Sequence, residues 1–153
     1  MAARPRPLLA VAALGGAAVL TACQKPPPLA TVVAAGHSYP AQASGWCVQG
    51  SQPRCKQFDR GVPTVTVDAG QVVGVDVDRT IAKGQWLVTL ERDGSKPVPV
   101  AAGEGSHYES FVAPSSRELG ASSVLMRVSV QRSETGRQDD RVGQWFYRLK
   151  LLS

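Results

Sequence analysis

Several residues and patterns are scarce in this chain, and each scarcity narrows the functions to consider. The sequence contains no asparagine, one isoleucine and two histidines, and arginine outnumbers lysine by twelve to five. This bias is typical of a G+C-rich coding sequence and carries no information on function. No G-x-S-x-G segment marks a hydrolase nucleophile elbow, and no amphipathic pattern is long enough for a major helix. These absences favour a β-rich protein without an evident catalytic motif.

The amino end carries one uncharged apolar run, Leu8 to Leu20, behind Arg4 and Arg6. Its 13 residues are fewer than the roughly 20 that a transmembrane helix needs, so a permanent span is disfavoured. A basic start, an apolar run and small residues at its end form the tripartite pattern of a secretory signal. The segment therefore predicts export.

The apolar run ends on Leu20-Thr21-Ala22-Cys23, which resembles a bacterial lipobox. In such signals the cysteine sulfur receives a diacylglycerol, and the residues before the cysteine are removed. Two acyl chains would hold the mature protein stably at the outer face of the cytoplasmic membrane, whereas one chain would let go. The alternative is an ordinary cleaved signal that leaves Cys23 as a chance thiol. The lipobox interpretation makes Cys23 the lipidated first residue of the mature protein.

Cleavage before Cys23 would divide the chain into a signal peptide at 1–22, a lipidated cysteine with a proline-rich spacer at 23–28, and one domain at 29–153. The mature part has 131 residues, a size typical of one domain. Its spacer of five residues reaches on the order of 15 Å and keeps the domain close to the membrane. The formal charge falls from +5 to +3, with 15 basic and 12 acidic residues. So small a charge predicts no nucleic-acid binding and modestly favours an anionic membrane or wall polymer.

Two further cysteines, Cys47 and Cys55, lie in a stretch rich in Ser, Gln, Gly and Pro between residues 37 and 61. Export would place them in an oxidising compartment, and with Cys23 lipidated they form the one remaining pair. We expect a structural disulfide worth roughly 2–3 kcal/mol in the chain-entropy model. A redox or metal pair is the alternative, but the C-x-x-C spacing is absent and no histidine lies close enough to complete a zinc set.

Apolar and polar residues alternate along most of the remaining chain, which is the period of half-buried strands. We expect about seven or eight strands, within 29–35, 63–67, 73–77, 86–91, 97–100, 106–112, 124–130 and 145–151. Asp93-Gly94 predicts a hairpin turn, the prolines of 97–100 predict an edge strand, and Ser115 with Glu118 predicts a capped helical turn. Residues 81–84 are expected to form a connection. The fold class predicted is all-β, an antiparallel β-sandwich of immunoglobulin-like architecture.

The order of these segments resembles a family of small actinobacterial secreted lipoproteins of unknown function. The resemblance is carried by the lipobox, KPPPLATVV, the paired-cysteine loop, GVPTVTVDAGQVVGVDV, IAKGQWLVTL and a terminal QWFYRLKL. These motifs describe strands and packing. The resemblance implies secretion, lipidation at Cys23 and a β-rich extracellular domain, and it brings no catalytic residues.

The sequence offers few residues for a catalytic or a metal site. Ser106 and His107 are adjacent, so a strand would turn them to opposite faces. A copper site could draw only on His37, Cys47, His107 and Met126, but Cys47 is better explained by its disulfide. Asp76 and Asp78 share a strand face, a placement from which two carboxylates could hold calcium, but the preferred interpretation is the solvated face of an amphipathic strand. The sequence predicts no cofactor, and no catalytic residue.

The terminal hairpin comes nearest to suggesting a contact surface. If Trp145, Tyr147, Leu149 and Leu151 face the core, alternation turns Phe146, Arg148 and Lys150 outward, and the phase of Val124 turns Arg127 outward as well. This basic face with one aromatic ring would contact an anionic headgroup, an anionic wall polymer or an acidic protein. The alternative is that the charges only solubilise an exposed sheet.

Three classes of function follow. The first is a non-enzymatic binding or structural module of the cell envelope, held at the membrane by its lipid and contacting an envelope protein or polymer. The second is a hydrolase of wall or lipid substrates, for which no acid-base or nucleophile cluster is found. The third is a transporter's solute receptor, which needs two lobes and more than 131 residues.

Overall fold

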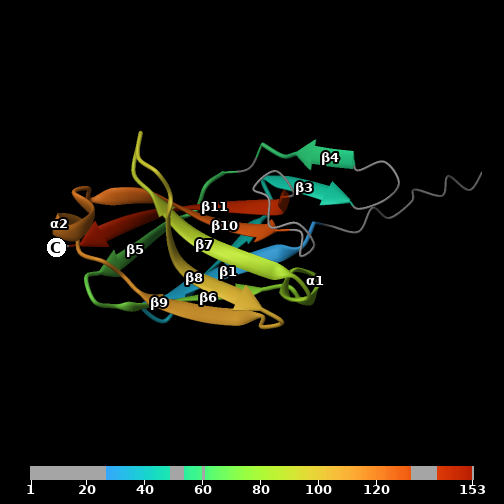
Figure 1. The fold of residues 1–153 in the computed structure, drawn as a ribbon. Coiled ribbons are helices and arrows are strands. Elements are labelled where there is room, and N and C mark those ends of the chain that lie inside the picture. Colours follow the sequence, from blue (N-terminus) through green and yellow to red (C-terminus); the bar gives the residue numbers. More distant parts are fainter. Residues whose placement is uncertain (1–26, 49–53, 60, 132–140, 153) are drawn as a thin grey trace, which may run out of the picture.

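The structure, a computed structural model, describes residues 27–48, 54–59, 61–131 and 141–152 (Figure 1). The predicted signal peptide and lipidated Cys23 lie outside the described residues. Strands dominate the described part, and they form two sheets that pack face to face as a β-sandwich. The predicted all-β fold class is therefore confirmed. No helix among the described residues has the length and apolar character needed to cross a bilayer.

The smaller sheet has four antiparallel strands in the order β2-β1-β6-β9. Its strands are β1 (Leu29–Ala34), β2 (His37–Gln42), β6 (Val72–Val77) and β9 (Tyr108–Val112). The hairpin between β1 and β2 closes on Ala35 and Gly36, both with positive φ, which is the conformation that a two-residue type I′ turn requires. This turn sets the register in which Ala34 faces His37.

The larger sheet has seven strands in the order β4-β3-β11-β10-β7-β8, with β5 beside β11. The members are β3 (Gly45–Val48), β4 (Arg54–Gln57), β5 (Thr64–Asp68), β7 (Gln85–Glu91), β8 (Val98–Glu104), β10 (Ser123–Gln131) and β11 (Arg141–Leu152). β10 occupies one edge of β11, so the other edge is shared: β3 pairs with its start and β5 pairs, in parallel, with its end. β11 therefore organises this sheet.

Two sequence predictions need correction at this point. The stretch from 37 to 61, in which no strand was predicted, contains the three strands β2, β3 and β4. Ser106 and His107 precede β9, which begins at Tyr108, instead of belonging to it. The predicted edge strand is confirmed as β8, which lies at the end of the sheet and is longer than expected.

The hydrophobic core lies between the two sheets and consists mainly of side chains at the inward positions of the strands. Trp86, Trp145 and Tyr147 are its largest buried side chains. Two of them also join the sheets: Trp145 Nε1 donates to the carbonyl of Pro28 at 3.0 Å, and the Tyr147 hydroxyl donates to the carbonyl of Ala30 at 2.6 Å. Burial raises the pKa of Tyr147, so this phenol remains a neutral donor at physiological pH. The chain is thus fastened to the core where it enters β1.

Two single-turn helices connect strands. α1 (Arg79–Ala82) replaces the expected connection at 81–84 and is capped by Asp78, whose Oδ1 accepts from the backbone N–H of Thr80 at 2.8 Å. α2 (Ser116–Leu119) shows the predicted capping box, in which Ser115 and Glu118 bond each other's backbone. The hydrogen bond from the Ser115 backbone lowers the pKa of Glu118, so the cap is expected to weaken only in acid.

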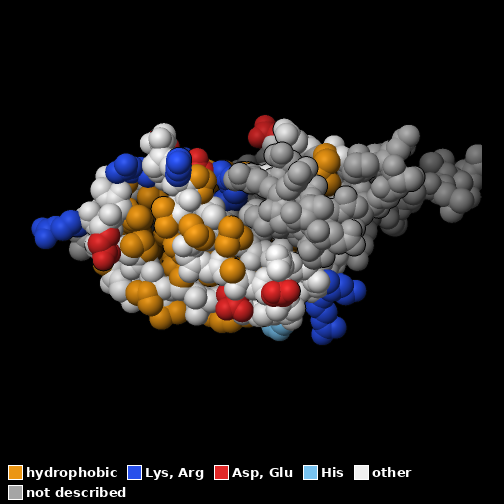
Figure 2. All heavy atoms as spheres, viewed as in Figure 1, with side chains coloured by type: hydrophobic (Ala, Val, Ile, Leu, Met, Phe, Trp, Pro, Cys, Tyr) orange, Lys and Arg blue, Asp and Glu red, His pale blue; other side chains and the backbone are white. Residues whose placement is uncertain are grey.

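Side chains on the outside of the molecule are distributed unevenly. In the view of Figure 2, hydrophobic side chains gather over the middle, where β7, β8 and β9 lie in Figure 1, and lysine and arginine side chains lie toward the rim. Exposed apolar groups also occur on the outer face of the smaller sheet, including Val72 and Val112. Exposed apolar groups therefore occur on both sides of the sandwich.

Candidate functional site

The four residues of the predicted basic face do share the outer face of the larger sheet. Arg127 on β10 lies directly opposite Phe146 on β11, and Arg148 and Lys150 follow along the same face of β11. Arg148 and Lys150 are exposed, whereas Arg127 and Phe146 are half-buried. The inward phase of Trp145, Tyr147, Leu149 and Leu151 is confirmed by their burial. The sequence-based geometry of this face is therefore correct.

Arg127 differs from the other two cations because its charge is already engaged. Its Nη2 lies 2.5 Å from Glu91 Oε2, and its side chain is only 16% exposed, against 28% for Glu91. The guanidinium carbon lies 5.5 Å from the centroid of the Phe146 ring, within the range of a cation–π contact. Arg127 thus orients Phe146 and offers little free charge to a partner.

Arg148 and Lys150 are the cations of this face that remain available. Neither has an ion-pair partner among the described residues. Across the sheet, Arg148 lies opposite Thr64 and Lys150 lies opposite Thr66 on the parallel strand β5. Both threonines are exposed, so two hydroxyls lie beside two cations, which is a donor set suited to phosphate or carboxylate.

A polar group is buried without a partner in the centre of the same face. Thr89 on β7 is the cross-strand neighbour of Arg127, and neither Thr89 Oγ1 nor Arg127 Nε has a hydrogen-bond partner within the described structure. A buried hydroxyl without a partner destabilises the folded state by about 1–3 kcal/mol.

We expect Thr89→Val to raise the free energy of unfolding by about 1 kcal/mol, because valine keeps the shape and removes the unpaired hydroxyl. Urea unfolding of the wild type and the variant measures this difference. Thr66→Val is the matched control, since Thr66 is exposed, and it should change stability by less than about 0.5 kcal/mol. A loss of stability in Thr89→Val would show that the hydroxyl is satisfied.

A depression of about 630 Å³ adjoins Phe146 where β3 meets β11. Its lining combines two aromatic rings with amide, hydroxyl and carboxyl groups, from Ser44, Gly45, Gln57, Phe58, Asp59, Gln144 and Phe146. Small-molecule sites commonly have volumes of roughly 300–1,000 Å³, with a few polar groups on an apolar lining. The depression is therefore large enough for a ligand fragment or for a side chain of a partner.

The depression was not predicted, apart from Phe146. Five of its other lining residues lie between 44 and 59, where no strand was predicted, and no sequence pattern marks them as a group. They meet β11 because β3 pairs with Gly143 and Gln144, which is a contact between segments nearly 100 residues apart. Trp46 on β3 contacts Trp145, with ring centroids 6.1 Å apart, and this contact supports the β3 side of the depression from the core.

The predicted disulfide is confirmed, and it joins β3, which borders the depression, to β4. Cys47 and Cys55 are directly opposite on β3 and β4, and their sulfurs are bonded. The bridge fixes the register in which β3 and β4 pair. The copper site considered above is therefore not formed, since Cys47 is oxidised in the disulfide and Met126 lies fully buried in the core.

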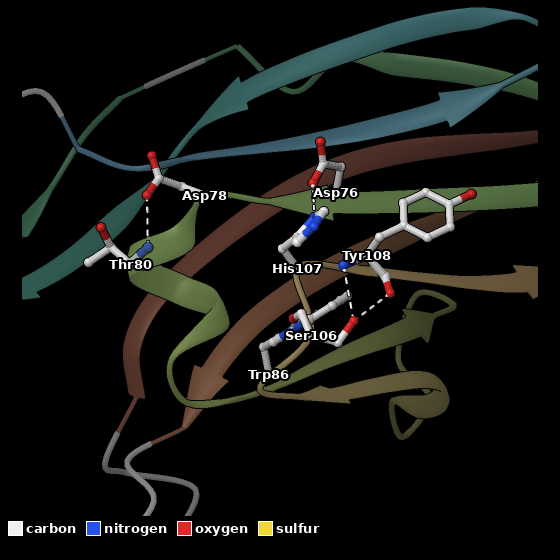
Figure 3. A network of polar contacts seen from close by, with 7 residues as sticks. All are labelled: Asp76, Asp78, Thr80, Trp86, Ser106, His107 and Tyr108. Carbon is white, nitrogen blue, oxygen red and sulfur yellow. Dashed lines mark hydrogen bonds and ion pairs between the residues drawn. The ribbon is translucent and has the colours of Figure 1, made fainter.

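The carboxylates considered for calcium have separate roles. Asp78 caps α1, whereas Asp76 Oδ1 lies 3.2 Å from His107 Nδ1 on the outer face of the smaller sheet (Figure 3). Nearby, Trp86 Nε1 donates to the carbonyl of Ser106 at 2.8 Å. No group of three or more potential metal ligands occurs among the described residues. The geometry thus favours ordinary capping and pairing at these carboxylates.

No protein-family model, curated protein or solved structure gives a significant match to this chain. The resemblance to actinobacterial lipoproteins therefore stays a prediction.

Proposed function

We propose that this protein is a lipid-anchored module of the cell envelope that binds an anionic partner without catalysing a reaction. The lipid on Cys23 would hold it at the outer face of the cytoplasmic membrane, and the short proline-rich spacer would keep the sandwich beside that membrane. The partner would be an anionic wall polymer or an acidic envelope protein. It would contact the outer face of the larger sheet.

The observation that carries the binding proposal is the pair of exposed cations, Arg148 and Lys150, next to the Phe146 depression. Glu91 compensates Arg127 but neither of these two. Because exposed charges at a rim act chiefly by attraction and orientation, Arg148 and Lys150 would draw an anionic chain onto the face. An apolar or polar group of that anionic chain would then enter the depression.

The geometry offers less to the alternative, an envelope hydrolase. The depression contains Ser44 and Asp59, but both histidines lie on the other side of the sandwich, His37 at the start of β2 and His107 before β9. A serine nucleophile needs a base within hydrogen-bonding reach. Neither histidine can supply that base to Ser44.

We expect the double substitution Arg148→Glu/Lys150→Glu to weaken binding of long-chain inorganic polyphosphate by about tenfold or more at low salt, since two attractive contacts become repulsive. The full-length protein in detergent micelles is titrated with the polymer at two ionic strengths. The difference should shrink at high salt because exposed charges are screened.

Arg79→Glu/Lys83→Glu is the matched control, because both residues are exposed and lie on or next to α1, at the other end of the molecule from the end of β11 (Figure 1). It produces the same net charge and should leave most of the affinity. Equal losses in the two double variants would mean that only net charge matters, and would contradict a binding face on β11.

A further inference from the structure

The outer face of the smaller sheet has almost no charge. Its four strands contain no lysine or arginine, and Asp76 is the one charged residue that they turn outward. Exposed apolar side chains share this face, namely Leu29, Val72, Tyr108 and Val112. An anionic polymer would find no counter-charge here. With no cation and a single carboxylate, this face is better suited to an uncharged ligand than to a polymer with many charges.

A tyrosine ring lies across the middle of this face. Gly74 on β6 leaves room for it, since a Cβ at that position would stand 2.4 Å from the Tyr108 hydroxyl oxygen and 2.9 Å from two of its ring carbons. Figure 3 shows the ring lying across β6. Nevertheless Tyr108 remains 47% exposed, so part of the ring stays open to solvent.

The backbone of Tyr108 is held in place as well. Ser106 Oγ donates to the Tyr108 carbonyl at 2.7 Å and accepts from its backbone N–H at 3.2 Å. The carbonyl of Ser106 itself accepts from the buried Trp86 at 2.8 Å. A ring fixed in this way loses little conformational freedom when a ligand stacks on it, which lowers the entropic cost of binding.

Hydrogen-bonding groups surround the ring. Asp76 is the strand partner of Tyr108 and of Thr31, and Ser110 is the partner of Gly74. His107 lies 3.2 Å from Asp76, and these two side chains are 70% and 54% exposed. A carboxylate, an imidazole and two hydroxyls can therefore donate to and accept from hydroxyl groups of a ligand.

We propose that this face binds an uncharged polysaccharide. The C–H groups on one side of a sugar ring carry slight positive charge and pack on the negative face of an aromatic ring, here Tyr108. The sugar hydroxyls would bond Asp76, His107 and Thr31, and the apolar residues on either side would accept neighbouring units of an extended chain. The face is opposite the one assigned to the anionic partner, so this inference does not depend on that assignment.

The test measures binding of neutral hexasaccharides of glucose, mannose, galactose, xylose and arabinose to the full-length protein in detergent micelles, by calorimetry. At least one should bind, whereas a uronic-acid oligosaccharide should not. Tyr108→Ala should weaken that binding about three- to tenfold. Tyr108→Phe should stay within about twofold of the wild type, because it keeps the stacking ring.

Two more variants separate loss of binding from loss of folding. Thr31→Arg adds bulk and charge to the face without removing a core group and should abolish binding, while Arg148→Glu on the opposite sheet should leave it unchanged. The proposal is overturned if none of the neutral sugars binds or if Tyr108→Ala binds as well as the wild type. It is equally overturned if sedimentation shows a dimer that Thr31→Arg dissociates, since a second copy would then occupy the face.

Discussion

Replacing Cys23 by serine is expected either to remove the protein from the detergent phase of an envelope extract or to leave it unprocessed, with residues 1–22 still attached. Serine has no thiol to receive the diacylglycerol, and the chain has no other apolar segment long enough to hold it in a bilayer after cleavage. Phase partitioning of wild-type and Cys23→Ser protein, followed by immunoblotting, measures the effect. An unprocessed variant would migrate more slowly than the wild type, because it would keep its signal peptide.

Ala22→Gly is the matched control for this experiment, because it changes the same segment by one methylene and keeps a small residue before the cysteine. It should remain in the detergent phase. If Cys23→Ser protein partitions like the wild type, with the same mobility, attachment depends on something other than a lipid at Cys23.

Trp145→Ala is expected to have the largest effect on stability, lowering the free energy of unfolding by about 3–5 kcal/mol. The ring is fully buried, packs against Trp46 and donates to the carbonyl of Pro28. Since small domains are stable by only about 5–15 kcal/mol, the variant should unfold at much lower urea. It should also loosen β3, the wall of the depression.

Trp145→Phe separates the hydrogen bond from the ring. It keeps an aromatic group in the core and removes the donor to Pro28, so it should cost clearly less than Trp145→Ala. Urea unfolding followed by circular dichroism compares the three proteins. A loss below about 1 kcal/mol in Trp145→Ala would contradict the packing described for β11.

Alternation along the chain was sufficient to predict the strands that form the core. The inward phase of β10 and β11, the edge position of β8 and the capping box of α2 are as expected, because each depends on residues close in sequence. Alternation of apolar and polar residues indicates which face of a strand is buried, and each of these core strands buries one face.

Pairing between distant segments could not be predicted in this way. The parallel contact of β5 with β11 and the pairing of β3 with β11 depend on a partner strand far away in the sequence. Pro40 and the glycines between residues 37 and 61 also lower the strand propensity of this stretch, so its strands are not indicated by composition. The depression was missed for the same reason.

The candidate basic face has one feature that could be predicted from the sequence and one that could not. Its four outward positions followed from alternation, but the engagement of Arg127 by Glu91, 36 residues earlier, depends on how β7 and β10 align. The exposed ring of Tyr108 over Gly74 likewise joins two strands, β9 and β6. Sequence patterns therefore placed side chains on faces, whereas the chemistry of each face required the register.

Lipid anchoring in the envelope is tested most directly by the intact mass of the protein extracted from membranes of cells that express it. We expect a chain that begins at Cys23 and carries the added mass of a diacylglyceryl group, with or without a further acyl chain on its amino group. A chain that retains residues 1–22, or one that begins at Cys23 without added lipid, would contradict it.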